Sequence, residues 1–118
     1  MTIRLPYLPS RVLSPNGRVH WRTKYAAAQS MKNDVMALVM EQGRPASPFP
    51  KALLTIRWEA KDNRRRDLDN LLASMKPALD GLVAAGVLED DSAMRLRVGL
   101  EYVGKCSENA TVMTVKKE

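Results

Sequence analysis

The pattern that most constrains the fold is the alternation of side chains over residues 51–60. Every second position from residue 52 to residue 58 holds an apolar side chain: Ala52, Leu54, Ile56 and Trp58. Successive side chains of a β-strand point to opposite faces, so this spacing predicts a strand with one face against a core. It is the clearest strand in the chain, and it leads directly into the most charged segment, residues 61–70.

Two longer stretches carry apolar residues at helical spacing instead. The first helix is expected over residues 23–42, with Thr23 as its N-cap and Gly43 directly after its end. The second is expected over residues 70–85. A kink or a restart is expected at Pro77, because proline lacks the amide hydrogen that a helix interior needs.

Three further segments are expected to be strands: residues 2–8, 94–102 and 111–117. A polar turn over residues 104–109 separates the last two, which predicts a closing hairpin. Residues 9–17, rich in Pro, Ser, Asn and Gly, are expected to form a loop. The element order β-α-β-α-β-β predicts an α+β fold, with a mixed four-stranded sheet packed by two main helices.

Length and composition predict one globular domain that covers residues 1–118. Lys and Arg number 19 against 13 Asp and Glu, and the net charge of +6 favours a polyanionic partner such as nucleic acid. No apolar run is long enough to span a bilayer, and the first residues do not resemble a signal peptide. A single cysteine, Cys106, suits a reducing compartment, so a cytoplasmic location is expected.

Seven of the 13 carboxylate residues of this basic chain lie within one stretch of thirty residues: Asp62, Asp67, Asp69, Asp80, Glu89, Asp90 and Asp91. If residues 67–69 are extended, Asp67 and Asp69 point to the same side, where they repel one another unless a cation lies between them. Mg²⁺ suits such a pair of oxygen ligands, with Mn²⁺ as a substitute. The alternative is a solvated charged loop with internal ion pairs.

Several basic residues are candidates for contacts with a nucleic-acid backbone, since guanidinium and ammonium groups bind phosphate. Arg64, Arg65 and Arg66 are the best of them; the others are Arg95, Arg97, Arg18, Arg22 and Lys24. Trp21 has two readings. It either caps the core at the start of the first helix, which is favoured, or stacks on an unpaired base.

Three motifs in order resemble the RusA family of Holliday junction resolvases, which are small endonucleases. They are Arg66-Asp67-Leu68-Asp69-Asn70, Lys76-Pro-Ala-Leu-Asp80 and Gly86-Val-Leu-Glu-Asp90-Asp91. The resemblance covers about residues 51–103. It implies a crossover junction endodeoxyribonuclease acting in DNA recombination and repair, with branched DNA and a second copy of the chain as partners and no organic cofactor.

The resemblance also implies roles for four residues. Asp67, Asp69 and Asp91 are the expected catalytic and metal-binding aspartates, and Lys76 is the expected catalytic lysine. Some family members place the lysine three residues nearer the DxDN motif. A shift from four to seven residues after Asp69 keeps the lysine on the same face of an uninterrupted helix, together with Asp80.

Hydrolysis of a phosphodiester by these groups is chemically self-consistent. A bound Mg²⁺ would activate water and neutralise charge on the phosphoryl group, and Lys76 would add a fixed positive charge. Two alternatives stay open at this point. One is a branched-DNA-binding protein without catalysis, whose acidic cluster is structural. The other is a nuclease that acts on flaps or replication forks.

Overall fold

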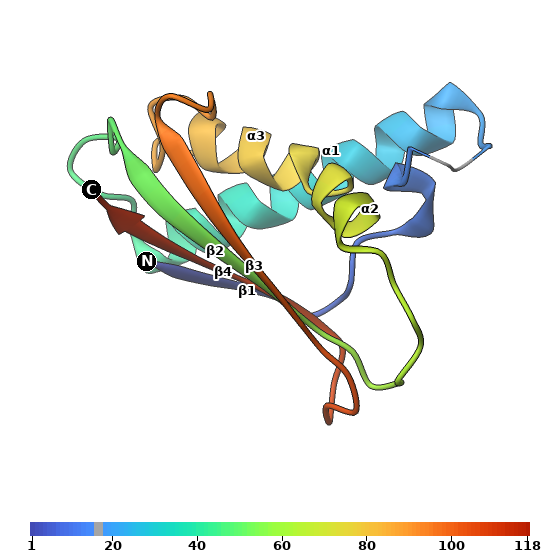
Figure 1. The fold of residues 1–118 in the computed structure, drawn as a ribbon. Helices are drawn as coiled ribbons and strands as arrows, with labels where there is room; N and C mark the ends of the chain where they lie inside the picture. The colour runs from blue at the N-terminus through green and yellow to red at the C-terminus, as the bar shows by residue number, and fades with distance from the viewer. Residues whose placement is uncertain (16–17) are drawn as a thin grey trace.

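The computed structural model describes residues 1–15 and 18–118, so Asn16 and Gly17 of the expected loop lie outside the described residues. In chain order the elements are β1 (Thr2–Leu5), η1 (Arg11–Leu13), α1 (Trp21–Gln42), β2 (Ala52–Glu59), α2 (Leu68–Ala73), α3 (Lys76–Ala84), β3 (Leu96–Val103) and β4 (Ala110–Lys117). The predicted α+β fold, with one four-stranded sheet and two main helices, is confirmed (Figure 1). No helix formed by the described residues is long and apolar enough to cross a membrane.

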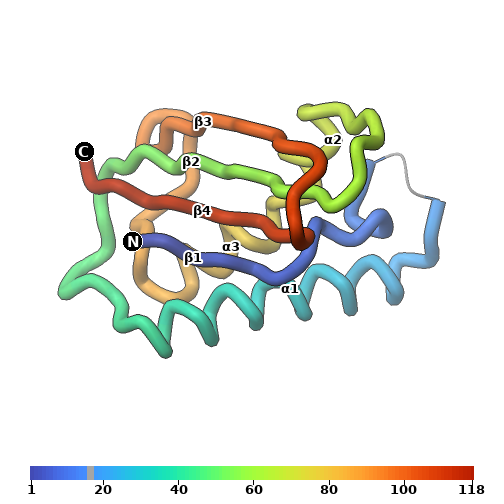
Figure 2. Tube along the Cα trace, turned by 90° about the horizontal axis from the view of Figure 1, so that it is seen from below, coloured from blue at the N-terminus to red at the C-terminus, as the bar shows by residue number. Residues whose placement is uncertain are grey.

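The sheet has the strand order β1-β4-β2-β3 and is mixed, as predicted (Figure 2). β2 pairs in parallel with β3, and β4 runs antiparallel to both β1 and β2. Parallel neighbours need a long crossover connection, and here α2 and α3 provide it between β2 and β3.

The predicted hairpin between the last two strands is wrong. β2 lies between β3 and β4, so the chain has to pass over the end of β2 to join them. The connecting residues 104–109 do this, and Cys106 donates its backbone amide hydrogen to the carbonyl oxygen of Ala60 at 2.8 Å. Alternation of side chains predicts that a segment is a strand, but it does not specify which strand is the neighbour.

The core lies between the sheet and the two longer helices, which cover one of its faces (Figure 1). The predicted apolar face of β2 is confirmed, because Ala52, Leu54, Ile56 and Trp58 are each at most 1% exposed. α1 contributes Met31, Val35 and Val39 to the same cluster. Removal of these side chains from water is the main favourable contribution to folding.

α1 begins two residues earlier than predicted, because His20 rather than Thr23 is its N-cap. The Nδ1 atom of His20 accepts a hydrogen bond of 3.1 Å from the backbone N–H of Arg22, which would otherwise lack a helical partner. The predicted end is confirmed. Gly43 has a φ of +97°, which favours glycine, and its N–H donates to the carbonyl oxygen of Val39 at 2.8 Å.

The second helical stretch is divided into α2 and α3, with Pro77 in the first turn of α3. The predicted restart at Pro77 is thereby confirmed, since the first turn is where proline costs a helix least. α3 then packs closely on α1. A Cβ atom at Gly81 would lie 3.0 Å from the carbonyl oxygen of Lys32 and 3.0 Å from the Cβ atom of Val35.

Figures 1 and 2 show that the N-terminal turns of α1 gather at one end of the molecule with η1, α2 and the segment after β2. The two termini lie at the opposite end. The fold therefore brings the charged segment after β2 next to the basic loop that precedes α1, although some fifty residues separate them in the chain.

Candidate functional site

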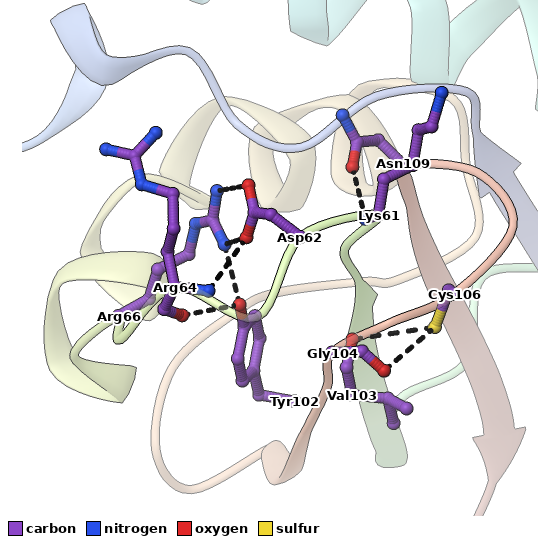
Figure 3. A network of polar contacts seen from close by, with 9 residues as sticks. All are labelled: Lys61, Asp62, Arg64, Arg66, Tyr102, Val103, Gly104, Cys106 and Asn109. Atoms are coloured by element: carbon purple, nitrogen blue, oxygen red, sulfur yellow. Dashed lines mark hydrogen bonds and ion pairs between the residues drawn. The ribbon is translucent and has the colours of Figure 1, made fainter.

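A network of polar contacts fixes the segment between β2 and α2 (Figure 3). The guanidinium group of Arg66 donates to both carboxylate oxygens of Asp62, at 2.7 and 3.1 Å. The same group donates to the hydroxyl oxygen of Tyr102 at 2.6 Å, and that hydroxyl donates to the carbonyl oxygen of Arg64 at 3.0 Å. Tyr102 belongs to β3, so the network attaches this segment to the edge of the sheet.

The charges of this network reinforce one another. The hydrogen bonds from Arg66 and from the backbone of Arg64 lower the pKa of Asp62 to about 2. The hydrogen bond with Asp62 in turn raises the pKa of Arg66. The Arg66 side chain is 23% exposed and already has two side-chain partners, which indicates a structural role for this predicted DNA contact. Arg65 is different, because its side chain is 94% exposed.

A cavity of about 310 Å³ lies beside this segment. Its walls come from the N-terminal loop, from the arginine run and from α2: Pro9, Ser10, Arg11, Ser14, Arg64, Arg65, Arg66, Asp67, Asn70, Leu71 and Ser74. Arg11 was not among the residues chosen from the sequence as DNA contacts, because it belongs to no motif, although it lies in the same basic loop as Arg18. Because Arg11 and the arginine run line the same cavity, two distant segments make it basic. This cavity is named the arginine cleft below.

Lys76 and Asp91 are 15 residues apart in the chain, and the structure brings them together, which is compatible with the shared site that the resemblance implies. The Nζ atom of Lys76 donates to Asp91 Oδ2 at 2.8 Å and lies 3.0 Å from Asp80 Oδ1, one helical turn away. The hydrogen bonds with Asp91 and Asp80 raise the pKa of Lys76. The hydrogen bond from Lys76 lowers the pKa of Asp91, so both groups are held in their charged forms.

Asp67 and Asp69 lie at the N-terminus of α2, as predicted, but the segment is not extended as far as Asp69. Asp67 has extended backbone angles and is the N-cap residue, whereas Asp69 already belongs to the first helical turn. Asp67 and Asp69 are therefore not alternate residues of one extended segment, and the prediction that they point to the same side is wrong in its geometry. The side chain of Asp67 is 56% exposed, and its ion pair with Arg65 is long, at 3.9 Å.

Asp69, Lys76 and Asp80 were predicted to share one helical face, and the structure confirms this only for Lys76 and Asp80. The turn between α2 and α3 interrupts the helix, so Asp69 and Lys76 do not belong to one regular helix. Lys76 and Asp80 do belong to one helix, and they form an ion pair.

The carboxylate groups have the oxygen donors that Mg²⁺ prefers, but the structure does not gather them into a ligand set. Within residues 1–15 and 18–118, no three His, Cys, Asp or Glu side chains form a group that could hold a metal ion. Asp91 is instead bonded to Lys76, whereas Asp67 is the N-cap residue of α2 and Asp69 belongs to its first turn. A metal ion would therefore bind these three aspartates only after their side chains move.

Two predicted DNA contacts near β3 already have carboxylate partners. Arg97 donates to both oxygens of Glu118, at 2.9 and 2.8 Å, and Arg95 lies 3.3 Å from Glu89. Arg18, Arg22 and Lys24 are exposed at the beginning of α1. The arginine cleft and the start of α1 are thus the more accessible basic surfaces.

The favoured reading of Trp21 as a cap on the core is wrong. Trp21 is 66% exposed, and it stacks against His20 with ring centroids 5.7 Å apart. The guanidinium group of Arg22 lies 5.4 Å from the centre of the tryptophan ring. One turn later, Tyr25 is 60% exposed. Helical spacing predicted which residues share a face, but these first turns extend past the end of the sheet (Figure 2), and residues 21–26 are all exposed.

Comparison with known proteins found one similar protein of undescribed activity. No protein-family model matches the chain. A protein described only as uncharacterized, from Xylella fastidiosa (strain Temecula1 / ATCC 700964), is 30% identical over 92 residues. These residues make up 75% of this chain and 60% of that protein, so the chain spans less than two thirds of its relative's length.

Proposed function

We propose that this protein is a Mg²⁺-dependent endodeoxyribonuclease that cuts four-way DNA junctions by paired hydrolysis. The observation that carries the proposal is the 2.8 Å hydrogen bond between Lys76 and Asp91. These two residues come from separate motifs of the RusA resemblance, and a shared site requires them to be close. Asp67 and the arginine run line one cavity, so carboxylate and phosphate-binding groups also occur side by side.

The roles of the side chains follow from their charges. Lys76 would place a fixed positive charge beside the phosphoryl group in the transition state, a type of contribution worth about 10²–10³ in rate. Arg65 and Arg11 would bind neighbouring phosphates, while Arg66 holds the segment in place. When bound by Asp67, Asp69 and Asp91, Mg²⁺ would supply an activated water and neutralise charge.

The proposal includes a homodimer and a cytoplasmic location. A four-way junction has approximate two-fold symmetry, and each chain contributes one candidate site, so a C2 dimer would place two sites for two symmetrical cuts. A single cysteine suits a reducing compartment.

The test is cleavage of a synthetic mobile four-way junction, with Mg²⁺ and with EDTA, beside a linear duplex of the same sequence. We expect paired symmetrical nicks that require Mg²⁺ and spare the duplex. Asp69→Asn should abolish cleavage yet retain binding, because it removes a negative charge near phosphate. Lys76→Ala should slow cleavage by about 10²–10³-fold. Glu41→Gln, an exposed carboxylate at the far end of α1, is the matched control and should cut normally.

A second candidate is a branched-DNA-binding protein without catalysis. The ion pairs of Lys76 with Asp80 and Asp91 favour it, because they give the acidic cluster a structural purpose. Tight junction binding without any cut, with Asp69→Asn altering only stability, would establish this candidate and refute the first. If flaps or forks are cut faster than junctions, the nuclease proposal stands with a different substrate.

A further inference from the structure

A second cavity, of about 420 Å³, is lined by none of the residues that line the arginine cleft. It is named the lysine–tyrosine groove here. Its walls come from the loop before α1, from α1, from the last residue of α2 and from α3: Leu13, Pro15, Lys24, Tyr25, Ala28, Gln29, Lys32, Ala73, Lys76, Pro77 and Asp80. The volume falls within the range of about 300–1,000 Å³ that is usual for small-molecule sites.

The groove combines an aromatic and apolar wall with a cationic rim. Tyr25 is 60% exposed, and its hydroxyl accepts a hydrogen bond of 3.1 Å from the side-chain amide of Gln29, which orients the ring. Lys24 and Lys32 extend from the same helix, and neither forms an ion pair with another described residue. An occupant with a flat apolar part and a negative charge would match both features.

One wall of the groove is shared with the candidate active site. Lys76 and Asp80 line it, and Lys76 is the group that bonds Asp91. The arginine cleft is close to the groove, because η1 and α2 contribute residues to the lining of each. A DNA strand whose phosphates lie in the arginine cleft would therefore bring the next nucleotide toward the groove.

We propose that the lysine–tyrosine groove binds one unstacked nucleobase of the DNA, next to the phosphate that faces Lys76. The inference rests on the proposed function, and it adds a base-binding site to it. The base would stack on Tyr25, and Lys24 and Lys32 would pair with the flanking phosphates. Bases at the centre of a branched DNA are the easiest to unstack, so this site would select for branched substrates.

The first test maps the contact without cleavage. Junctions carrying a single 5-iododeoxyuridine at each nucleotide around the branch point are irradiated with the protein in EDTA, and the cross-linked residue is identified by mass spectrometry. We expect a cross-link to Tyr25 from a position beside the branch point. Cross-linking to Trp21 alone, one turn nearer the helix start and outside the groove lining, would overturn the inference.

The second test measures binding of the same junction, and of a single-stranded oligonucleotide, by Tyr25 variants. Tyr25→Leu should weaken binding by about 5- to 150-fold, the range for loss of one base–aromatic stack. Tyr25→Phe is the matched control, because it keeps the ring and loses only the bond with Gln29. It should bind within about twofold of the original protein.

The third test uses a second pair of variants, one of which fills the groove. Ala73→Leu adds a side chain to the groove wall and should weaken binding, whereas Ala26→Leu adds the same side chain to an exposed position of α1 outside the lining.

Equal binding by all these variants, with junction cleavage intact, would refute the base site and leave the proposed function in place. If no branched DNA binds at all, both proposals fail. If Tyr25→Leu instead changes the oligomeric state in sedimentation, the groove is covered by a second copy of the chain.

Discussion

Tyr102→Phe tests whether the polar network attaches the charged segment to the sheet. The substitution removes one oxygen atom and leaves the aromatic ring in place. Two hydrogen bonds are lost: the one that Arg66 donates at 2.6 Å and the one that Tyr102 donates to the carbonyl oxygen of Arg64 at 3.0 Å. Arg66 keeps its two hydrogen bonds with Asp62, so its charge is not left without a partner.

The expected loss of stability follows from the kind and exposure of these bonds. A neutral hydrogen bond contributes about 0.5–1.5 kcal/mol and one to a charged group about 1.5–3 kcal/mol. The Arg66 side chain is 23% exposed, so water replaces part of what is lost, and the sum falls to roughly 1–2 kcal/mol. For a domain of this size, about 4 °C per kcal/mol predicts a fall in Tm of roughly 4–8 °C.

The assay is thermal unfolding followed by circular dichroism, with Tyr25→Phe as the matched control. The control loses only an exposed hydrogen bond with Gln29 and should change stability by less than about 0.5 kcal/mol. Under the proposed function, DNA cleavage by Tyr102→Phe should also fall, because Arg64 and Asp67 are then held less firmly. Equal Tm values for the two variants would refute the claim that Tyr102 fixes this segment.

Two further predictions concern stability. Alanine normally stabilises a helix by about 1 kcal/mol relative to glycine. Gly81→Ala should instead destabilise by up to about 2 kcal/mol in urea unfolding, because its Cβ would press on the backbone of Lys32 and the Cβ of Val35. Gly99→Ala, whose Cβ would only touch the Thr55 hydroxyl oxygen at 3.9 Å, is the control; a stabilised Gly81→Ala would contradict the close packing. The depressed pKa of Asp62, about 2 against a usual 3.8, means that its carboxylate stabilises the fold above about pH 4 and that this contribution is lost as the pH falls toward 2. The Tm difference between the original protein and Asp62→Asn should therefore be largest near neutral pH and should shrink between about pH 4 and pH 2. A difference independent of pH would argue against the ion pair between Asp62 and Arg66.

The parts of the fold that follow from local side-chain spacing were predictable. Period-two alternation predicted β2 and its buried face, and Gly43 and Pro77 marked a helix end and a helix start. Pairing between strands was not predictable in the same way, because it depends on where the crossover helices place β3. The predicted closing hairpin failed for this reason.

In the candidate site, too, only part of the observed contacts could be predicted from the sequence. The family resemblance assigned Lys76 and Asp91 to one site, and the structure has them hydrogen-bonded. It did not anticipate that Arg66 is bound by Asp62 and Tyr102, because 36 residues separate Arg66 from Tyr102 and an arginine in a charged run has many possible partners. Trp21 was misread because helical periodicity does not reveal that a helix extends beyond its core.

The strand order has a consequence for how the chain folds during its synthesis. β4 comes last among the four strands, yet it lies between β1 and β2 and pairs with both. Until residues 110–117 leave the ribosome, β1 has no strand to pair with. A nascent chain ending before them can form at most the β2–β3 pair with its helices, and its unfinished strand edges are exposed to aggregation. The sheet can therefore be completed only after β4 has left the ribosome. Forms that stall or are truncated before residue 110 should depend on chaperones far more than forms that contain β4.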